Sequence, residues 1–472
     1  MVNTTTISSD TQRGHDQSDV THRNNWRGAR LNNVGDLTRL DRILAFTILF
    51  ISAWNFCLPV AGHVDLPWWV AKIQFLPRLY INEALFIVYL VLVSFRRVQR
   101  LILRLKYPNS LACTCMIVLA VWCAVISTFG PLPLHDLGRS GRLILMALLL
   151  IAATQWAAHE PLYFLRAFLI GLIAGTIVNL FYTFAHPYII VGALPRLLGQ
   201  NTPGPAMGIG VCLSAWLLLL SRKRIDVFIA FWGTVICGSG ALISYSKIGL
   251  FACFAGFLCL TAVALKALWI RKSHLMFYFI VLLTIVSFIY SMSENSQVFY
   301  CSLKQMIVEK LNFMDSSKHK STQIRMKYVV GVGEILLSHP VGVGFSGFKE
   351  AMMITDAYHS GQAADESAIN PADSNPHAFI LYYASAGGFI GGTLSLAAFM
   401  LLWHMMHRGM RAYGLAGIAV ANLTGMAYLV MAISVPYLLN SAIMIIPAAV
   451  AGGLLIRSGG RTGKLGRLIE TN

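Results

Sequence analysis

Charged side chains are scarce in this 472-residue sequence: Asp, Glu, Lys and Arg together make up 12% of it, while hydrophobic residues make up 56%. The mean hydropathy of +0.64 is too high for a water-soluble chain of this length. This shortage of charge excludes a soluble globular protein. It predicts an all-α, polytopic integral membrane protein.

Acidic residues are the rarer charged group, with 20 Asp and Glu against 37 Lys and Arg. No Asp-x-Asp motif is present to hold Mg²⁺ beside a diphosphate, and no Cys-x-x-Cys pair offers a metal site. Eight of the nine cysteines lie in predicted membrane spans and only Cys301 lies in a loop, so no disulfide framework is indicated. We therefore expect neither a metal nor a cofactor.

Long apolar runs are what the sequence has in abundance. A helix needs roughly 20 apolar residues to cross a bilayer. About twelve such spans are predicted, at 43–61, 79–95, 110–129, 143–158, 162–184, 205–221, 226–243, 248–270, 275–292, 387–406, 412–434 and 438–456.

More than half of the Lys and Arg residues precede the first span, follow the last, or lie in alternate connections. The positive-inside rule then places both termini in the cytoplasm. Topology and attraction to the membrane surface explain most of the net charge of +17, so no nucleic-acid partner is expected. The chain is therefore predicted to begin with a disordered cytoplasmic tail (1–42) and nine spans (43–292). An outer loop (293–376), three spans (377–456) and a basic cytoplasmic tail (457–472) follow.

The loop at 293–376 is too long to be a simple connection, and such loops are usually functional or disordered. Its segment 321–340 predicts a helix that carries Arg325 in the middle of an apolar face. A guanidinium there costs several kcal/mol unless an anion meets it. A salt bridge to Glu83 or Asp136, a side chain that extends to water, and a bound phosphate are the three alternatives.

Two stretches after this helix have features of a ligand site. HPVGVGFSGF (339–348) is a glycine-rich turn whose backbone can approach a ligand closely. In NPHAFILYYASAGGFIGG (375–392), Asn375 and Pro376 predict a helix start with His377 in the first turn. The helix dipole there favours a bound anion and a neutral imidazole that accepts a proton. A hydrogen-bonded structural histidine is the alternative.

Further cations are predicted on the same outer face. Lys247 lies in the short SYSK connection (244–247), and Arg139 and Arg142 precede the fourth span. Arg142 at a helix N-terminus is unfavourable with the dipole unless an anion compensates. Together with Arg325 and His377, these cations suggest a phosphate-bearing lipid substrate and one proton acceptor.

The arrangement of an arginine, fourteen residues, PVGVGFSGF and then NPHAFILYYASAGGFIGG resembles the signature of the O-antigen ligase and O-antigen polymerase superfamily of bacterial inner membranes. SYSKIGLFA (244–252) is similar to a further segment of that family, with Lys247 replacing the usual arginine. GQNTPGPAMGIGV (199–211) is similar to its upstream loop. The resemblance covers roughly residues 199–406.

The resemblance implies a metal-independent glycosyltransferase that moves a glycan from undecaprenyl diphosphate to an acceptor hydroxyl, with its active site facing the periplasm. His377 would be the general base or would orient the acceptor, and Arg325 would bind the diphosphate, with Lys247, Arg139 and Arg142 as further diphosphate ligands. A ligase would use the lipid A core of lipopolysaccharide as acceptor. A polymerase would extend a lipid-linked repeat of O-antigen or exopolysaccharide, and a transporter or flippase of lipid-linked glycan is a third hypothesis.

Overall fold

The structure is a computed structural model. It describes residues 37–58, 74–76, 79–102, 108–185, 190–191, 194–195, 203–221, 223–244, 246–270, 320–362, 376, 378–433, 435–436 and 438–457. The chain divides into two compact units, Met1–Arg42 and Ile43–Asn472. The predicted tails at 1–42 and 457–472 therefore lie almost wholly outside the described residues.

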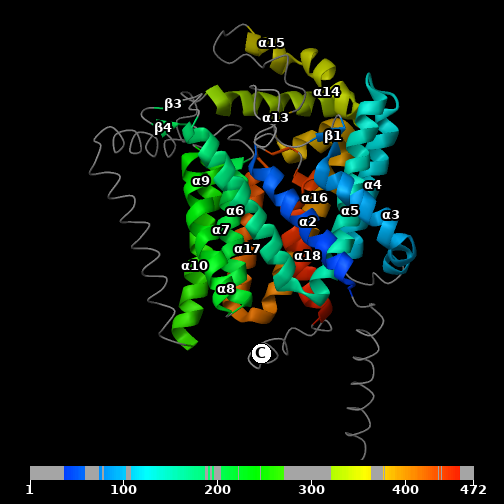
Figure 1. Ribbon diagram of the computed structural model, residues 1–472. Coiled ribbons are helices and arrows are strands. Elements are labelled where there is room, and N and C mark those ends of the chain that lie inside the picture. Colours follow the sequence, from blue (N-terminus) through cyan, green and yellow to red (C-terminus); the bar gives the residue numbers. More distant parts are fainter. Residues whose placement is uncertain are drawn as a thin grey trace, which may run out of the picture. The chain divides into compact units, whose positions relative to one another are not determined.

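Helices make up almost all of the described chain (Figure 1). Four of them begin at a proline, whose missing amide hydrogen would be unpaired at that position anyway. The long helices are α2 (Arg39–Cys57), α3 (Ile81–Ile102), α4 (Pro108–Ser127), α5 (Pro133–His159), α6 (Pro161–Ala185), α7 (Pro203–Leu220), α10 (Lys247–Ile270), α13 (Lys320–Ser338), α16 (Phe379–Met410), α17 (Gly414–Met431) and α18 (Ala442–Arg457).

Shorter elements complete the described chain. A short π-helix, η1 (Gly233–Cys237), joins α8 (Arg224–Trp232) to α9 (Gly238–Ile243), and the other short helices are α14 (Gly344–Met353), α15 (Asp356–Gln362), η3 (Arg411–Tyr413) and η4 (Leu438–Asn440). Two small antiparallel hairpins pair β1 (Gln74–Leu76) with β2 (Leu79–Tyr80) and β3 (Ile190–Val191) with β4 (Leu194–Pro195).

Seven helical segments of the described chain are long and apolar enough to cross a membrane, by length and composition. The prediction of an all-α protein with membrane-spanning helices is confirmed to that extent, whereas the number found is seven rather than twelve. Three further apolar helices, within α3, α4 and α18, are shorter, and α16 and α17 form one continuous segment through η3. The predicted span at 275–292 lies outside the described residues.

Small residues bring the helices of the second unit close together. A Cβ atom on Gly208 of α7 would lie 2.6 Å from Ala252 Cβ of α10, and one on Gly175 of α6 would lie 2.7 Å from the carbonyl oxygen of Trp54 of α2. Such close backbone approach is typical of helices that pack in a membrane. The helix pairs α5 with α18 and α4 with α16 are also in extensive contact.

Helix α16 is broken about one quarter of the way along its length. Gly387 (φ −123°, ψ 18°) and Gly388 (φ 65°, ψ −157°) have non-helical backbone angles. The carbonyl group of Gly387 accepts a hydrogen bond of 2.7 Å from the indole Nε1–H of Trp122 on α4. A non-glycine residue rarely adopts the angles of Gly388. Gly387 and Gly388 therefore permit the break.

The turn between α13 and α14 fills this break. The amide of Phe389 donates to the carbonyl oxygen of Pro340 (3.1 Å), and the amide of Val343 donates to the carbonyl oxygen of Ser385 (2.9 Å). The backbone groups freed by the break thus find partners in the turn, as buried backbone groups must. Figure 1 shows α13, α14 and α15 together at one end of the helices, here called the α13 end.

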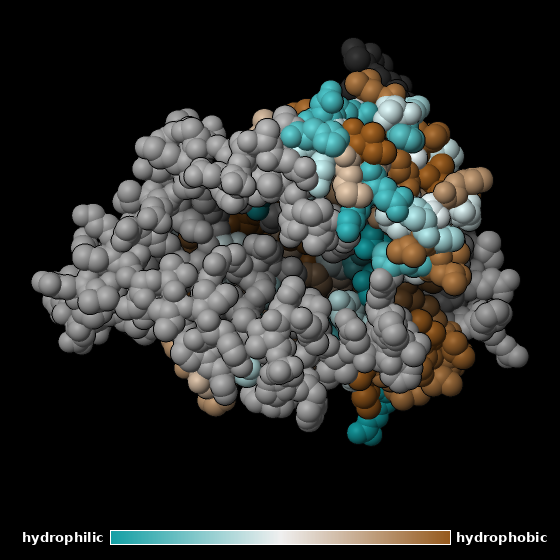
Figure 2. All heavy atoms as spheres, turned by 90° about the horizontal axis from the view of Figure 1, so that it is seen from above, coloured by the Kyte–Doolittle hydropathy of each residue, from teal (hydrophilic) through white to brown (hydrophobic). Residues whose placement is uncertain are grey.

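Figure 2 looks onto the α13 end, where hydrophilic residues of the described chain lie among hydrophobic ones. Elements from distant parts of the sequence meet here, because α14 contacts α4, α5 and α16. This end therefore brings the beginning of α5 next to the residues that carry the glycine-rich turn.

Candidate functional site

Asp136, near the beginning of α5, binds α14 through hydrogen bonds. Its carboxylate is fully buried, and Oδ2 accepts two hydrogen bonds of 2.8 Å, from the backbone amide and from the hydroxyl of Ser346. Ser346 is the third residue of α14, whose N-cap residue Val343 gives no side-chain cap. Asp136 therefore caps α14 from another helix, with its negative charge at the positive end of the dipole.

His135 contacts the other oxygen of the same carboxylate, with Nδ1 2.9 Å from Asp136 Oδ1. If Nδ1 donates, the second ring nitrogen, Nε2, is left as a proton acceptor. Sequence reasoning missed this pair as a candidate. The adjacent His-Asp letters after Pro133, a residue that favours the first position of a helix, were the only signal for it.

Arg139 makes cation–π contacts with two stacked aromatic rings, one on α14 and one on α16. The rings of Phe345 and Tyr382 stack with centroids 5.1 Å apart, and the guanidinium carbon of Arg139 lies 5.9 Å from each centroid. Its Nη1 also donates to the carbonyl oxygen of Phe345 (3.3 Å). Cation–π contacts of this kind contribute about 0.5–2 kcal/mol each. Arg139 thus contacts the two segments that carry the resemblance.

Arg142 has its compensating anion within the chain. Its Nε lies 2.8 Å from Glu83 Oε1, and its Nη2 donates to Glu83 Oε2 at 3.0 Å. The amide of Tyr80 donates to the same carboxylate (3.1 Å), and the guanidinium carbon lies 4.8 Å from the centre of the Tyr80 ring. Because α5 begins at Pro133, Arg142 lies well inside the helix and the prediction that it stands at a helix N-terminus is wrong. Glu83 nevertheless neutralises its charge.

Arg325 lies in α13 with its side chain half-buried, and it makes no hydrogen bond or ion pair with other residues of the described chain. Burial lowers the pKa of its guanidinium below the ordinary value. The two carboxylates considered as salt-bridge partners, Glu83 and Asp136, are engaged by other groups. The salt-bridge alternative is therefore wrong for these two residues.

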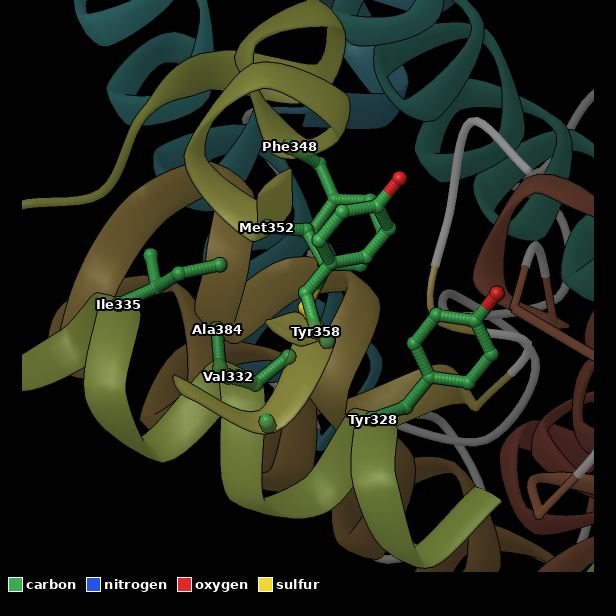
Figure 3. Packing of buried hydrophobic residues seen from close by; sticks show 8 residues of the cluster. Tyr328, Val332, Ile335, Phe348, Met352, Tyr358 and Ala384 are labelled. Atoms are coloured by element: carbon green, nitrogen blue, oxygen red, sulfur yellow. The ribbon is translucent and has the colours of Figure 1, made fainter. Parts of the chain in front are cut away.

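The predicted amphipathic helix is present and packs through one face. Tyr328, Val332 and Ile335 of α13 are buried against α14, α15 and α16 (Figure 3). Figure 3 shows their side chains directed toward those of Phe348 and Met352 on α14, Tyr358 on α15 and Ala384 on α16. Val329, which neighbours this face on the helix, is 47% exposed, so the buried face does not extend to it.

The glycine-rich turn approaches a helix backbone rather than an open space. Gly342 has φ +97°, and a Cβ atom on it would lie 2.5 Å from the carbonyl oxygen of Ala386 and 2.5 Å from the amide nitrogen of Gly388. Glycine at position 342 is thus required for this close approach, whereas the approach of the turn to a ligand stays a prediction. The group it approaches in the structure is the break of α16.

The predicted start of α16 is wrong by a few residues. The helix begins at Phe379, and its N-cap is Ala378, with extended backbone angles (φ −134°, ψ 138°) and no side-chain cap. The amide of Phe379 donates to the carbonyl oxygen of Ala432 at the end of α17 (2.8 Å). This contact with α17 accompanies the start of the helix, two residues later in the sequence than His377.

Two predicted site residues lie beyond this description. His377 itself is outside the described residues, and Lys247 is described only as the backbone of the first residue of α10. The structure thus brings Arg139 together with the glycine-rich turn and α16, joins Arg325 to them through α13, and leaves the placement of His377 and the Lys247 side chain as predictions.

No protein-family model matches the chain, and no curated protein sequence matches it. Among the described residues, no group of three or more His, Cys, Asp or Glu side chains is arranged to hold a metal ion. The fold defines an all-α protein with membrane-spanning helices. The family resemblance rests on the sequence motifs.

Proposed function

We propose that the protein is a membrane glycosyltransferase that transfers a glycan from undecaprenyl diphosphate to the hydroxyl of an acceptor glycan, without a metal or other cofactor. An O-antigen ligase, with the lipid A core as acceptor, is the form we favour. The twelve spans, the bacterial inner membrane, the cytoplasmic termini and a periplasmic α13 end are parts of the same proposal.

The packing of α13, α14 and α16 as one unit is the observation that carries the proposal. Up to about fifty residues separate Arg325, the glycine-rich turn and the segment after His377 in the sequence. In the structure the turn is hydrogen-bonded to α16, and one face of α13 is buried against α14 and α16. A set of motifs that acts on one substrate requires this proximity.

Arg325 supports a role in binding the diphosphate. Its half-buried guanidinium lacks an internal carboxylate among the described residues, and a partly desolvated cation binds an anion more strongly than an exposed one does. The fork of donors on a guanidinium matches phosphate oxygens. In the proposed reaction Arg325 stabilises the negative charge that develops on the leaving diphosphate.

The proposed chemistry is a direct displacement at the anomeric carbon. His377 accepts the proton of the acceptor hydroxyl, or orients this hydroxyl, as the oxygen forms a bond to the anomeric carbon. The bond from that carbon to the diphosphate oxygen breaks, and undecaprenyl diphosphate leaves with the bonding electrons. Lys247, Arg139 and Arg142 are proposed as further diphosphate ligands, and Arg142 is the weakest of them because Glu83 already pairs with it.

Reconstituted protein with undecaprenyl diphosphate-linked glycan and an acceptor tests the proposal. We expect His377→Ala to bind the donor and to fail in transfer, whereas His359→Ala, which changes an exposed histidine on α15, retains both functions. Unchanged transfer by His377→Ala would remove the role of His377. Movement of donor across vesicles with no change in its covalent state would indicate a transporter.

Ligase and polymerase differ only in the acceptor, so the glycans of a deletion strain separate them. Polymer that accumulates on its lipid carrier, with no capped lipid A, indicates a ligase. Single repeats that remain on the lipid A core indicate a polymerase. The break in α16 is a feature that transporters also have, but here the break is filled by the turn between α13 and α14.

A further inference from the structure

We propose that α13 lies in the membrane interface, with its outward face in contact with the acyl chains of the bilayer. This face is formed by Met326, Val330, Gly333 and Leu337, here called the outer stripe. The proposal concerns a lipid-binding surface and stands independently of the proposed transferase reaction.

The outer stripe is apolar and uncovered. Met326, Val330 and Leu337 are 59%, 53% and 84% exposed, and a Cβ atom on Gly333 would meet nothing within 4 Å. These residues are spaced by four, three and four positions, so they form one row along the helix. A row of large exposed apolar side chains marks an interaction surface.

The outer stripe lies opposite the packed face of α13. Successive residues of an α-helix are about 100° apart around its axis, so residues two positions apart are separated by about 200°. Val330 is two positions from the buried Tyr328 and Val332, and Leu337 is two positions from the buried Ile335. One helix therefore has two apolar faces, one against the protein and one against its surroundings. A helix that packs on a soluble domain would have a polar outer face.

Exposed apolar residues continue from the outer stripe onto α16. Val341 follows Leu337 by four residues and is 50% exposed, and it adjoins Pro340, whose carbonyl oxygen binds the amide of Phe389. Phe389 and Ile390 are also exposed, and they belong to a segment apolar enough to span a membrane. This continuity identifies the occupant of the stripe as bilayer lipid.

The position of the break in α16 gives the depth of α13. Phe389 follows the break, and Arg408 is the first Lys or Arg after it in α16, nineteen residues on. At 1.5 Å per residue this stretch is about 28 Å long, which is close to the roughly 30 Å of bilayer hydrocarbon. Phe389 therefore lies where hydrocarbon meets headgroups, and so does the turn that binds it. A helix joined directly to that turn lies at interfacial depth.

Arg325 gains a specific position from this arrangement. On the helix it lies between the outer stripe and the buried face, on the side opposite Lys327 and Glu334. Interfacial α13 would hold its guanidinium at the level of lipid phosphate groups. Lipid contact along the outer stripe thereby places the guanidinium of Arg325 where an anionic lipid headgroup is found.

Spin labelling of the full-length protein in nanodiscs of phosphatidylethanolamine and phosphatidylglycerol tests this proposal. Nitroxide labels are placed at Val330→Cys and Leu337→Cys, with Glu350→Cys on the exposed face of α14 as the matched control. The unsubstituted protein gives the background, since the eight described cysteines are buried or half-buried. We expect a ratio of oxygen to nickel-chelate accessibility several-fold higher at 330 and 337 than at 350.

Three results would overturn the proposal. A nickel-chelate accessibility at 337 equal to that at 350 would place the stripe in water. Exclusion of both reagents at 330 and 337 would show that protein, either another part of this chain or a second copy, covers the stripe. A high oxygen ratio that appears only after undecaprenyl diphosphate is added would identify a polyprenyl site instead of bilayer contact.

Discussion

The beginning of α5 and the helix α13 both place positive charge at the α13 end, but they differ in what neutralises it. At the beginning of α5, Arg142 pairs with the carboxylate of Glu83, and Arg139 lies against two aromatic rings. In α13, Arg325 is half-buried with no hydrogen-bond or ion-pair partner in the described chain. A cation with a partner stabilises the fold, whereas one without a partner is retained at a cost, which is typical of a binding site.

The turn that joins these two regions is where the largest effect is expected. Gly388→Ala would force a side chain into a left-handed backbone conformation and against the carbonyl oxygen of Pro340. We expect a loss of at least about 3 kcal/mol in the free energy of unfolding, because backbone strain and overpacking add. Thermal unfolding in detergent measures it.

Gly414→Ala is the matched control for this change. Gly414 has nearly the same angles as Gly388 (φ 73°, ψ −158°), but a Cβ atom on it would meet nothing within 4 Å. Gly414→Ala should therefore lower the free energy of unfolding only by the cost of backbone strain, about 1–3 kcal/mol. Equal losses at both positions would show that the contact of the turn with α16 contributes nothing.

Arg325→Met sharpens the comparison by separating function from stability. Transfer should fall by about 10²–10³-fold, the usual effect of removing one group that stabilises developing charge. The lowered pKa means that the folded state disfavours the charged guanidinium. This cost is present at all pH values below the pKa, so the free energy of unfolding at pH 7 should be unchanged or rise by up to about 1 kcal/mol. A large loss of stability would show that Arg325 has a structural partner.

Arg142→Met should have the opposite profile. The change leaves the buried Glu83 carboxylate without its cation, and we expect the free energy of unfolding to fall by about 3 kcal/mol. Donor binding by the folded fraction should be retained within a few-fold. The double change Arg142→Met with Glu83→Gln should recover part of the stability. A selective loss of donor binding greater than a few-fold in a fully stable Arg142→Met protein would make Arg142 a main ligand of the diphosphate instead of the weakest one.

Helix positions were largely predictable from the sequence because they depend on local apolar runs. The span predicted at 162–184 corresponds to Pro161–Ala185, and the one predicted at 248–270 to Lys247–Ile270. Helix α5 begins ten residues before its predicted start at 143. Hydropathy excluded these ten residues for their charges, but partners elsewhere in the chain, such as Ser346 for Asp136, satisfy the charges.

The candidate site was predictable only in part. Helical periodicity found Arg325, whereas the pairing of Arg142 with Glu83 joins residues 59 positions apart and depends on how α3 packs against α5. The break in α16 was not predicted either, since the glycines of GGFIGG (387–392) are equally compatible with close packing of two unbroken helices. Local patterns therefore locate the charged groups, and tertiary contacts decide which of them remain available to a substrate.

The smallest effect is expected at the contact that docks α14 on α5. Ser346→Ala removes the hydroxyl that donates to Asp136 and accepts from the amide of Leu132 (3.2 Å), but it keeps the bond from the Ser346 amide. A loss of about 1 kcal/mol in the free energy of unfolding follows, because one buried hydrogen bond to a charged group is removed while the carboxylate keeps other donors. Ser338→Ala, whose exposed hydroxyl bonds only to carbonyl groups of its own helix and to the neighbouring His339, should change it by less than about 0.5 kcal/mol. Equal effects of the two changes would mean that the hydroxyl bond from Ser346 to Asp136 contributes nothing to the docking of α14 on α5.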